Sequence, residues 1–297
     1  MESKINRAIA EAAARINAFS SECGAVAYPD RGLPDRSKVI EITERLRGVM
    51  FPGYFEAPSA RNNVYASGYK LTKICEDLRL QLRRAFGADD ESKQQTAEEA
   101  LCGFVEALPE VQKLLATDAQ ALFDGDPAAN SVTDVIFSYP GLFAITVYRL
   151  AHVLCLLKVP LIPRMMTEYA HSQTGIDINA GARIGSYFFI DHGTGVVIGE
   201  TTVIGDNVKL YQGVTLGALS TRKGQLLSGT KRHPTLGSRV TVYSGASILG
   251  GDTVIGDDCI IGANAFVTGS VPANTRVSVN SPELNFRENR PAVWENV

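Results

Sequence analysis

The sequence has no excess of charge of either sign. Its 297 residues include 29 Lys and Arg against 32 Asp and Glu, which gives a net charge of −3. Nucleic-acid binding usually needs a basic surface, so this balance argues against a nucleic-acid partner. The five cysteines are odd in number and form no CxxC pair. Their scatter argues against a zinc ribbon or a disulfide scaffold and favours a reducing compartment.

The sequence also lacks a long hydrophobic run. Its two long uncharged stretches, residues 135–148 and 259–275, are shorter than a membrane span, and each contains a proline. The first thirty residues carry several charged side chains and do not contain the apolar core of a secretory signal. We therefore expect a cytoplasmic protein with no membrane segment.

The chain changes character near residue 175. Before this point, apolar residues such as Ile5 and Ile9 recur at helical spacing, and prolines stand where helix ends are expected. Beyond it, glycine and β-branched residues dominate. We predict an α+β protein whose first part is an all-α helical domain. Three segments are expected: the helical domain over 1–172, a repeat domain over 173–280 and a C-terminal tail over 281–297.

The second half repeats with a period of six. One aliphatic residue stands at each step, glycine often follows it, and the step is offset at only a few places. Three short parallel strands of this kind form one coil of a β-solenoid, whose stacked aliphatics make a continuous core. The pattern predicts a left-handed parallel β-helix of hexapeptide repeats. The aliphatic positions are Ile178, Ile184, Ile190, Ile198, Ile204, Leu210, Leu216, Leu236, Val242, Ile248, Ile255, Ile261 and Val267.

Two histidines lie in irregular polar segments of this repeat. His192 stands where the period slips from six to eight, and His233 ends a polar insertion that follows Leu216. A solenoid accommodates such an insertion only as an external loop, and loops on repeat proteins tend to carry function. Because hexapeptide helices commonly trimerise, a loop of one chain could place His233 beside His192 of its neighbour. His152 is expected to be a packed core histidine, and His171 receives no role.

A general base can be built around His192. A histidine near a carboxylate is competent near neutral pH, because its unperturbed pKa is about 6.5. Asp177 precedes His192 by fifteen residues, close to the eighteen or so of one coil, so it falls near the position stacked one coil away. We expect Asp177 to orient the imidazole of His192 as a triad carboxylate does.

The sequence gives less support to three other functions: nucleotide binding, zinc catalysis and a purely structural role. No nucleotide-binding glycine motif occurs in the required context. A zinc enzyme on this fold, of the γ-class carbonic anhydrase kind, uses three histidines, whereas the repeat offers two, so no metal is expected. A non-catalytic solenoid is the remaining alternative, and it would have a regular coil without a polar insertion.

Several short motifs stand between about Phe123 and Val271. They are Asp126-Pro-Ala, Tyr148-Arg149, Asp177-Ile178, Ile190-Asp-His-Gly-Thr-Gly, Gly199-Glu-Thr, Gln212-Gly-Val-Thr-Leu-Gly and Arg232-His-Pro. Together they resemble the motifs of serine O-acetyltransferases, the first enzymes of cysteine synthesis. The resemblance implies a helical domain before a left-handed β-helix, and direct transfer of the acetyl group of acetyl-CoA to the hydroxyl of L-serine.

The resemblance also implies a role for individual residues. His192 would be the base that takes the serine proton, with Asp177 and His233 as the other catalytic residues. Asp126 and Asp191 would bind the ammonium of serine, while Arg232 and His233 would bind its carboxylate. Acetyl-CoA would lie along the solenoid where small residues let the pantetheine arm approach the backbone. The residues expected to contact acetyl-CoA are Gly217, Ala218, Ser244, Gly245 and Ala263.

The acceptor and the partners stay open at this point. Homoserine, a sugar or an amine could replace serine, although paired carboxylates with Arg232 favour an amino acid. The assembly is expected to be a homotrimer or a dimer of trimers. L-cysteine has the ammonium and carboxylate of serine and is expected to act as a feedback inhibitor that competes with serine.

The C-terminal tail bears on a possible protein partner. Family members that dock onto O-acetylserine sulfhydrylase do so with a C-terminal isoleucine, whereas this chain ends in Val297 with Trp294 close by. The lost methylene and the bulky indole both disfavour a narrow cleft. We expect a weak or absent complex with the sulfhydrylase.

Overall fold

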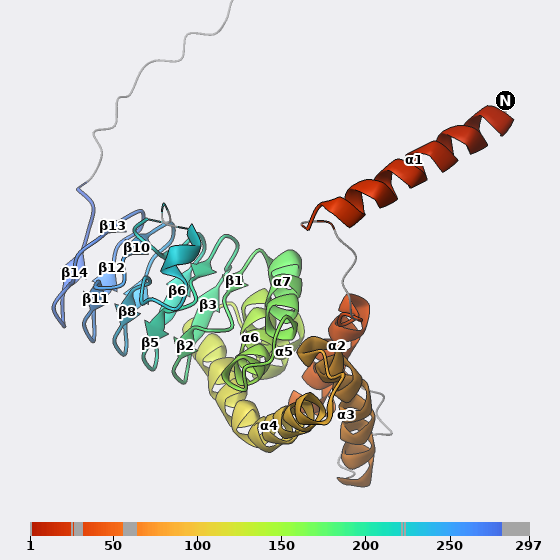
Figure 1. Cartoon of the computed structure of the whole chain (residues 1–297). Helices are drawn as coiled ribbons and strands as arrows, with labels where there is room; N and C mark the ends of the chain where they lie inside the picture. The colour runs from red at the N-terminus through yellow and green to blue at the C-terminus, as the bar shows by residue number, and fades with distance from the viewer. Residues whose placement is uncertain are drawn as a thin grey trace, which may run out of the picture.

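The chain folds as a set of helices followed by a coil of short parallel strands (Figure 1). The computed structural model describes residues 2–24, 26, 32–55, 64–220, 222 and 224–280. The predictions about the tail at 281–297 therefore lie outside the described residues. The helices are α1 (Glu2–Glu22), α2 (Arg36–Met50), α3 (Val64–Phe86), α4 (Glu91–Gly125), α5 (Val132–Ser138), α6 (Pro140–Leu156) and α7 (Ile162–Thr174).

The strands are two or three residues long and begin directly after α7. Their shortness follows from the six-residue repeat, in which each strand is followed by a turn. The strands are β1 (Asp177–Ile178), β2 (Arg183–Ile184), β3 (Phe189–Asp191), β4 (Val197–Ile198), β5 (Val203–Ile204), β6 (Lys209–Tyr211), β7 (Thr215–Gly217), β8 (Thr235–Leu236), β9 (Thr241–Val242), β10 (Ser247–Leu249), β11 (Val254–Ile255), β12 (Ile260–Ile261), β13 (Phe266–Val267) and β14 (Arg276–Val277).

Three parallel sheets form the three sides of the solenoid. We call them side A (β1-β4-β7-β10-β13), side B (β11-β8-β5-β2) and side C (β14-β12-β9-β6-β3). The predicted aliphatics stack in register; on side A, Leu216 pairs with Ile198 below and Ile248 above. All thirteen except Ile184, on the edge strand β2, are buried. These findings confirm the predicted left-handed parallel β-helix and the helical region before it.

A buried ion pair joins the helices to the first coil. The guanidinium of Arg149 on α6 donates to both carboxylate oxygens of Asp118 on α4, at 2.5 and 2.8 Å. The same guanidinium donates to the backbone carbonyls of Ile184 and Gly185, while the amide of Phe188 donates to Asp118 at 2.9 Å. The pair therefore satisfies backbone groups of an edge strand that has no further strand to bond.

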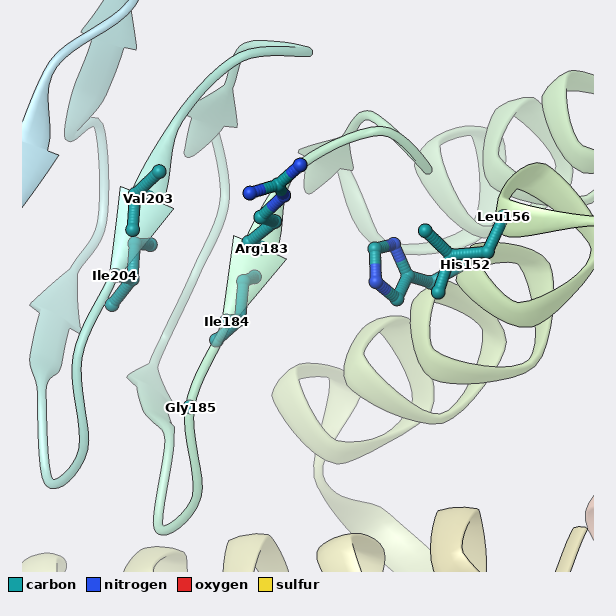
Figure 2. A pocket seen from close by; sticks show the side chains of 7 residues that line it. All are labelled: His152, Leu156, Arg183, Ile184, Gly185, Val203 and Ile204. Atoms are coloured by element: carbon teal, nitrogen blue, oxygen red, sulfur yellow. The ribbon is translucent and has the colours of Figure 1, made fainter. Parts of the chain in front are cut away.

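Two more side chains of α6 bond the same coil. Tyr148 donates to the carbonyl of Ala182, and Nδ1 of His152 bonds the carbonyl of Ala180, both at 2.7 Å. His152 points toward β2 across a cavity of about 420 Å³ (Figure 2). It is packed against Tyr148 but only half-buried, because its other side lines the groove between α6 and side B, so it does not lie in the core as predicted.

Close packing brings the helices against β3. A Cβ added to Gly125, at the end of α4, would lie 2.5 Å from the ring of Phe189. A Cβ added to Gly141 on α6 would lie 2.3 Å from the carbonyl oxygen of Ile190. Glycine is needed at both places because the backbones approach too closely for a side chain. The residue after Gly125 is consequently held next to the end of β3.

Among the described residues, no single helix is long and apolar enough to cross a membrane. The successive helices α5 and α6 reach that length only together, with a bend of 74° between them.

The buried ion pair predicts a large loss of stability on removal of one partner. In Asp118→Asn the charge of Arg149 stays buried without its counterion, so we expect the free energy of unfolding in urea to fall by about 3–5 kcal/mol. The exposed pair of Arg239 with Asp258 is the matched control, and Arg239→Gln should unfold at the wild-type urea concentration. Equal unfolding midpoints for the two variants would contradict this account of the interface.

Candidate functional site

One group of site residues lies where the end of α4 meets the end of β3. Tyr139, the N-cap residue before α6, donates a hydrogen bond of 2.5 Å to the carboxylate of Asp126, and the amide of Ala128 donates to the other oxygen. Asp191 ends β3, and its carboxylate accepts from the amide of His192 at 2.7 Å. The same carboxylate oxygen is 3.5 Å from Nδ1 of His192.

The carboxylates of Asp126 and Asp191 make this group of side chains negatively charged. The hydrogen bond from Tyr139 lowers the pKa of Asp126, and a charge on His192 lowers it further. The same bond raises the pKa of Tyr139 to about 12. Asp126 therefore keeps its negative charge, and Tyr139 stays a neutral donor that fixes the carboxylate in place.

The backbone presents His192 to solvent. Its φ of +56° lies in the left-handed region, which non-glycine residues adopt only where the surroundings impose it. Gly193 follows with φ +73°, and a Cβ there would lie 2.4 Å from Ile176. In this single chain the side chain of His192 is 69% exposed, so its ring is accessible to a substrate or a second subunit.

A second group of site residues lies beside the polar insertion. The hydroxyl of Thr201 accepts from the amides of Arg232 and His233 at 2.9 and 3.1 Å. The guanidinium of Arg232 forms an ion pair with Glu200. The sequence Gly199-Glu-Thr therefore positions both predicted carboxylate-binding residues, a role that the sequence analysis did not assign.

The contacts of His233 fix its tautomer. The amide of Thr201 donates to Nδ1 at 3.0 Å, so Nδ1 carries no hydrogen and the neutral ring holds its proton on Nε2. Burial, with the nearby charge of Arg232, lowers the pKa of His233 to about 4. Near neutral pH the ring can donate from Nε2 but has no free lone pair, so this geometry favours a hydrogen-bond donor over a base.

The two groups lie at different corners of the solenoid. His192 stands between β3 on side C and β4 on side A, whereas His233 stands between β7 on side A and β8 on side B. The five residues expected to contact acetyl-CoA are divided in the same way. Ser244, Gly245 and Ala263 lie at the C–A corner with His192, while Gly217 and Ala218 lie at the A–B corner with Arg232. Among the described residues, no hydrogen bond or ion pair joins His192 to His233.

A cavity at the A–B corner adjoins the insertion. It has a volume of about 260 Å³, and its lining includes Ala218, Arg232 and the backbone of Gly250 and Gly251. Small residues here leave room for an extended chain beside the backbone. The predicted contact at Ala218 thus borders a real cavity.

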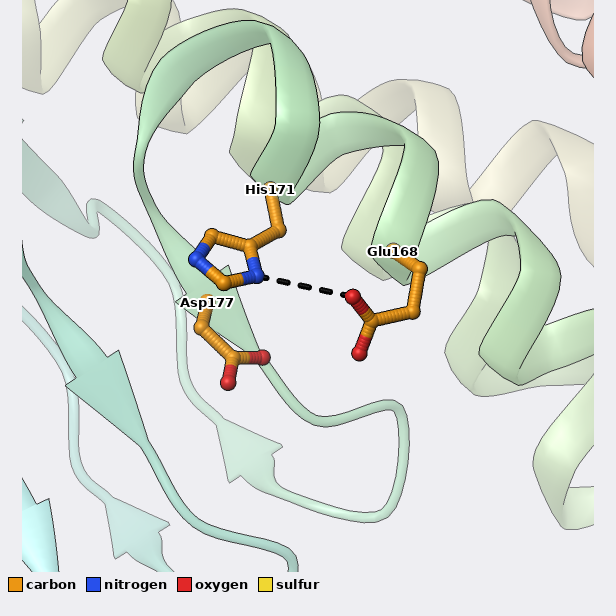
Figure 3. Close-up of side chains that lie close together, drawn as sticks. All are labelled: Glu168, His171 and Asp177. Atoms are coloured by element: carbon orange, nitrogen blue, oxygen red, sulfur yellow. Dashed lines mark ion pairs between the residues drawn. The ribbon is translucent and has the colours of Figure 1, made fainter.

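Asp177 lies in a cluster of its own at the start of side A. Its carboxylate is 4.0 Å from the guanidinium of Arg164, and Figure 3 shows it facing His171 and Glu168 of α7. Nδ1 of His171 is 3.5 Å from Glu168, and the three side chains offer metal-type ligand atoms within 4.8 Å of one another. Arg164 also pairs with Glu168, which opposes the binding of a second cation.

The predicted contact between Asp177 and His192 is not made in this chain. Within the described part of the chain, no hydrogen bond or ion pair joins them, and Asp191 is the carboxylate next to the imidazole. Asp177 pairs in register with Val197, which stands five residues after His192. Asp177 and His192 therefore flank the same corner of the solenoid, one coil apart. A rotation of the exposed imidazole about its side-chain bonds would be needed to bring them together.

Comparison with known proteins identifies the family. No protein-family model matches the chain. The chain is 45% identical over 266 residues to the plasmid serine acetyltransferase of Synechococcus elongatus, a match that covers 84% of this chain and 82% of that protein. The chain belongs to the serine acetyltransferase family.

Solved serine acetyltransferases share the fold. Isoform 3 from Entamoeba histolytica, crystallised in complex with cysteine, superposes with a TM-score of 0.75 at 32% identity over 88% of this chain and 86% of that chain. The enzyme from Neisseria gonorrhoeae in complex with serine gives a TM-score of 0.55 at 25% identity over 81% of this chain and 95% of that chain. The predicted family, enzyme class and fold are thereby confirmed.

The bonding of His233 predicts an unusual titration. In ¹⁵N NMR spectra of the imidazole, we expect the Nε2–H tautomer and a midpoint near pH 4. The unfolded chain takes up this proton near pH 6.5, so the free energy of unfolding should fall as the pH drops from about 6.5 toward 4. His233→Asn should flatten this part of the stability profile. A midpoint above pH 6 in the folded protein would contradict the assigned hydrogen bond.

Proposed function

We propose that this chain transfers the acetyl group of acetyl-CoA to the hydroxyl of L-serine. The observation that carries the proposal is the separation of charge between the two groups of site residues. Asp126 and Asp191 offer carboxylates to an ammonium, whereas Arg232 and His233 offer donors to a carboxylate. Serine is a zwitterion, and its two charges need partners of opposite sign. The family membership supports the same acceptor.

The chemistry follows from the exposed imidazole. His192 takes the proton of the serine hydroxyl as the oxygen attacks the thioester carbonyl of acetyl-CoA. The carbon–sulfur bond then breaks, and the leaving thiolate of CoA receives the proton from the imidazolium. Asp191 is placed to stabilise that imidazolium, since its carboxylate lies 3.5 Å from the ring. Asp177 is the second candidate for this role once His192 turns toward side A.

We propose that the complete site forms between two subunits of a homotrimer. A rigid three-sided coil cannot bring its own C–A and A–B corners together. In a ring of three chains, the His192 corner of one subunit meets the Arg232 corner of the next. The residues expected to bind L-serine are divided between these two corners, and so are the residues expected to contact acetyl-CoA. This division supports a binding site between subunits for both substrates.

L-Cysteine should occupy the serine position. It has the same ammonium and carboxylate, and the related isoform 3 from Entamoeba histolytica was crystallised in complex with cysteine. Binding to the same charged groups makes cysteine a competitor of serine and a feedback inhibitor of the pathway to cysteine. A weak or absent complex with O-acetylserine sulfhydrylase and a cytoplasmic location stay predictions.

The direct test is release of free CoA thiol from acetyl-CoA in the presence of serine, homoserine or glucosamine. We expect the highest kcat/KM with serine and competitive inhibition by cysteine. His192→Asn should lower kcat by ~10²–10⁴, as is usual when a general base is removed, while its unfolding curve stays that of wild type. Faster turnover of homoserine or glucosamine, or wild-type turnover in folded His192→Asn, would overturn the proposal.

A further inference from the structure

The first helix carries an apolar face that nothing in the described chain covers. Every residue from 3 to 19 is exposed, including four large apolar side chains. In Figure 1, α1 stands clear of the other helices. The side chains of Ile5, Ile9, Ile16 and Phe19 are 58–62% exposed. One stripe of this size on a helix of 21 residues indicates a missing partner, because helices in proteins gain most of their stability from packing of an apolar face.

The spacing of the stripe is that of a coiled coil. Ile5, Ile9, Ala12, Ile16 and Phe19 follow one another by four, three, four and three residues. This mean spacing of 3.5 residues is the heptad seam, which stays on one side of a supercoiled helix, whereas a helix packed on a globular core shows a wider stripe. Ile5, Ala12 and Phe19 take the d positions, and Ile9 and Ile16 take the a positions.

The cysteine after the helix continues the seam. Cys23 lies seven residues beyond Ile16, at the next a position, and its amide still bonds the carbonyl of Phe19 at 2.9 Å as in a helix. Its side chain is therefore expected on the same face as the stripe.

The flanking residues are compatible with a parallel pair. In a parallel, in-register pair, each g residue faces the e residue five positions later on the partner. These pairs are Ala8 with Ala13 and Arg15 with Ser20, so no like charges meet.

We infer that α1 is an assembly helix that pairs with α1 of other copies of this chain in a parallel, in-register coiled coil. Three strands match the homotrimer of the proposed function, and helices related by its threefold axis run parallel, so the strand number and the direction both rest on that proposal. The small residues Ala8 and Ala13 beside the seam let the helices approach closely.

Cys23 provides the test. In the full chain carrying Cys102→Ser, which removes the exposed cysteine, oxidation should join Cys23 to Cys23 of a neighbouring copy and give a covalent dimer on a non-reducing gel. In a three-stranded coil the third chain has no partner, so conversion should stop at about two thirds of the chains. The matched control is Cys23→Ser with Ser21→Cys, whose thiol lies on the outer face and should not form the dimer.

A second variant separates this inference from the proposed function. Ile16→Asp should abolish the Cys23 dimer by placing a charge in the seam, while thiol release with serine stays within twofold of wild type. Failure of the serine assay would leave the cross-linking result readable, because the gel needs no activity. Equal dimer formation by the Ser21→Cys control, or a Cys23 dimer undiminished by Ile16→Asp, would overturn the inference. Complete conversion to dimer would overturn the three-stranded form.

Discussion

The buried ion pair between Asp118 and Arg149 is the constraint on which the site depends. It joins α4, α6 and the first coil through five hydrogen bonds, and both side chains are almost fully withdrawn from solvent. An uncompensated charge at this depth is costly, so the two helices and the coil hold together as one unit. Gly125 and Gly141 then let the helices approach β3 without a gap.

This docking explains why an enzyme of this kind keeps a helical domain. Asp126 follows Gly125 directly, so fixing the end of α4 against β3 also fixes Asp126 beside Asp191. Tyr139 completes the arrangement, because it caps the start of α6 and holds the carboxylate of Asp126. The anionic half of the proposed site is thus assembled from two helices and one strand, whereas its cationic half belongs wholly to the solenoid.

The repeat pattern was sufficient to predict the solenoid, since each aliphatic at the six-residue step has one possible direction, inward. The same pattern located His192 and His233, because both interrupt it. It could not predict that Thr201 locks the tautomer of His233, since that contact joins residues 32 positions apart through a backbone amide. Tyr139 carried no signal either, because α5 separates it from Asp126 in the sequence and only the fold brings its hydroxyl to that carboxylate. The expected contact of Asp177 with His192 was inferred from coil arithmetic, which gives the corner but not the direction of a side chain.

The central claim is that the two halves of one site come from two subunits, and mixing inactive variants tests it most directly. His192→Asn removes the base, and Arg232→Ala removes the carboxylate partner, so each homotrimer should be nearly inactive. In trimers that contain both variants, isolated through different affinity tags, one of the three interfaces carries an intact pair of corners, and activity should return to about one third of wild type. Mixed trimers no more active than either parent would place the whole site within one chain and contradict the account.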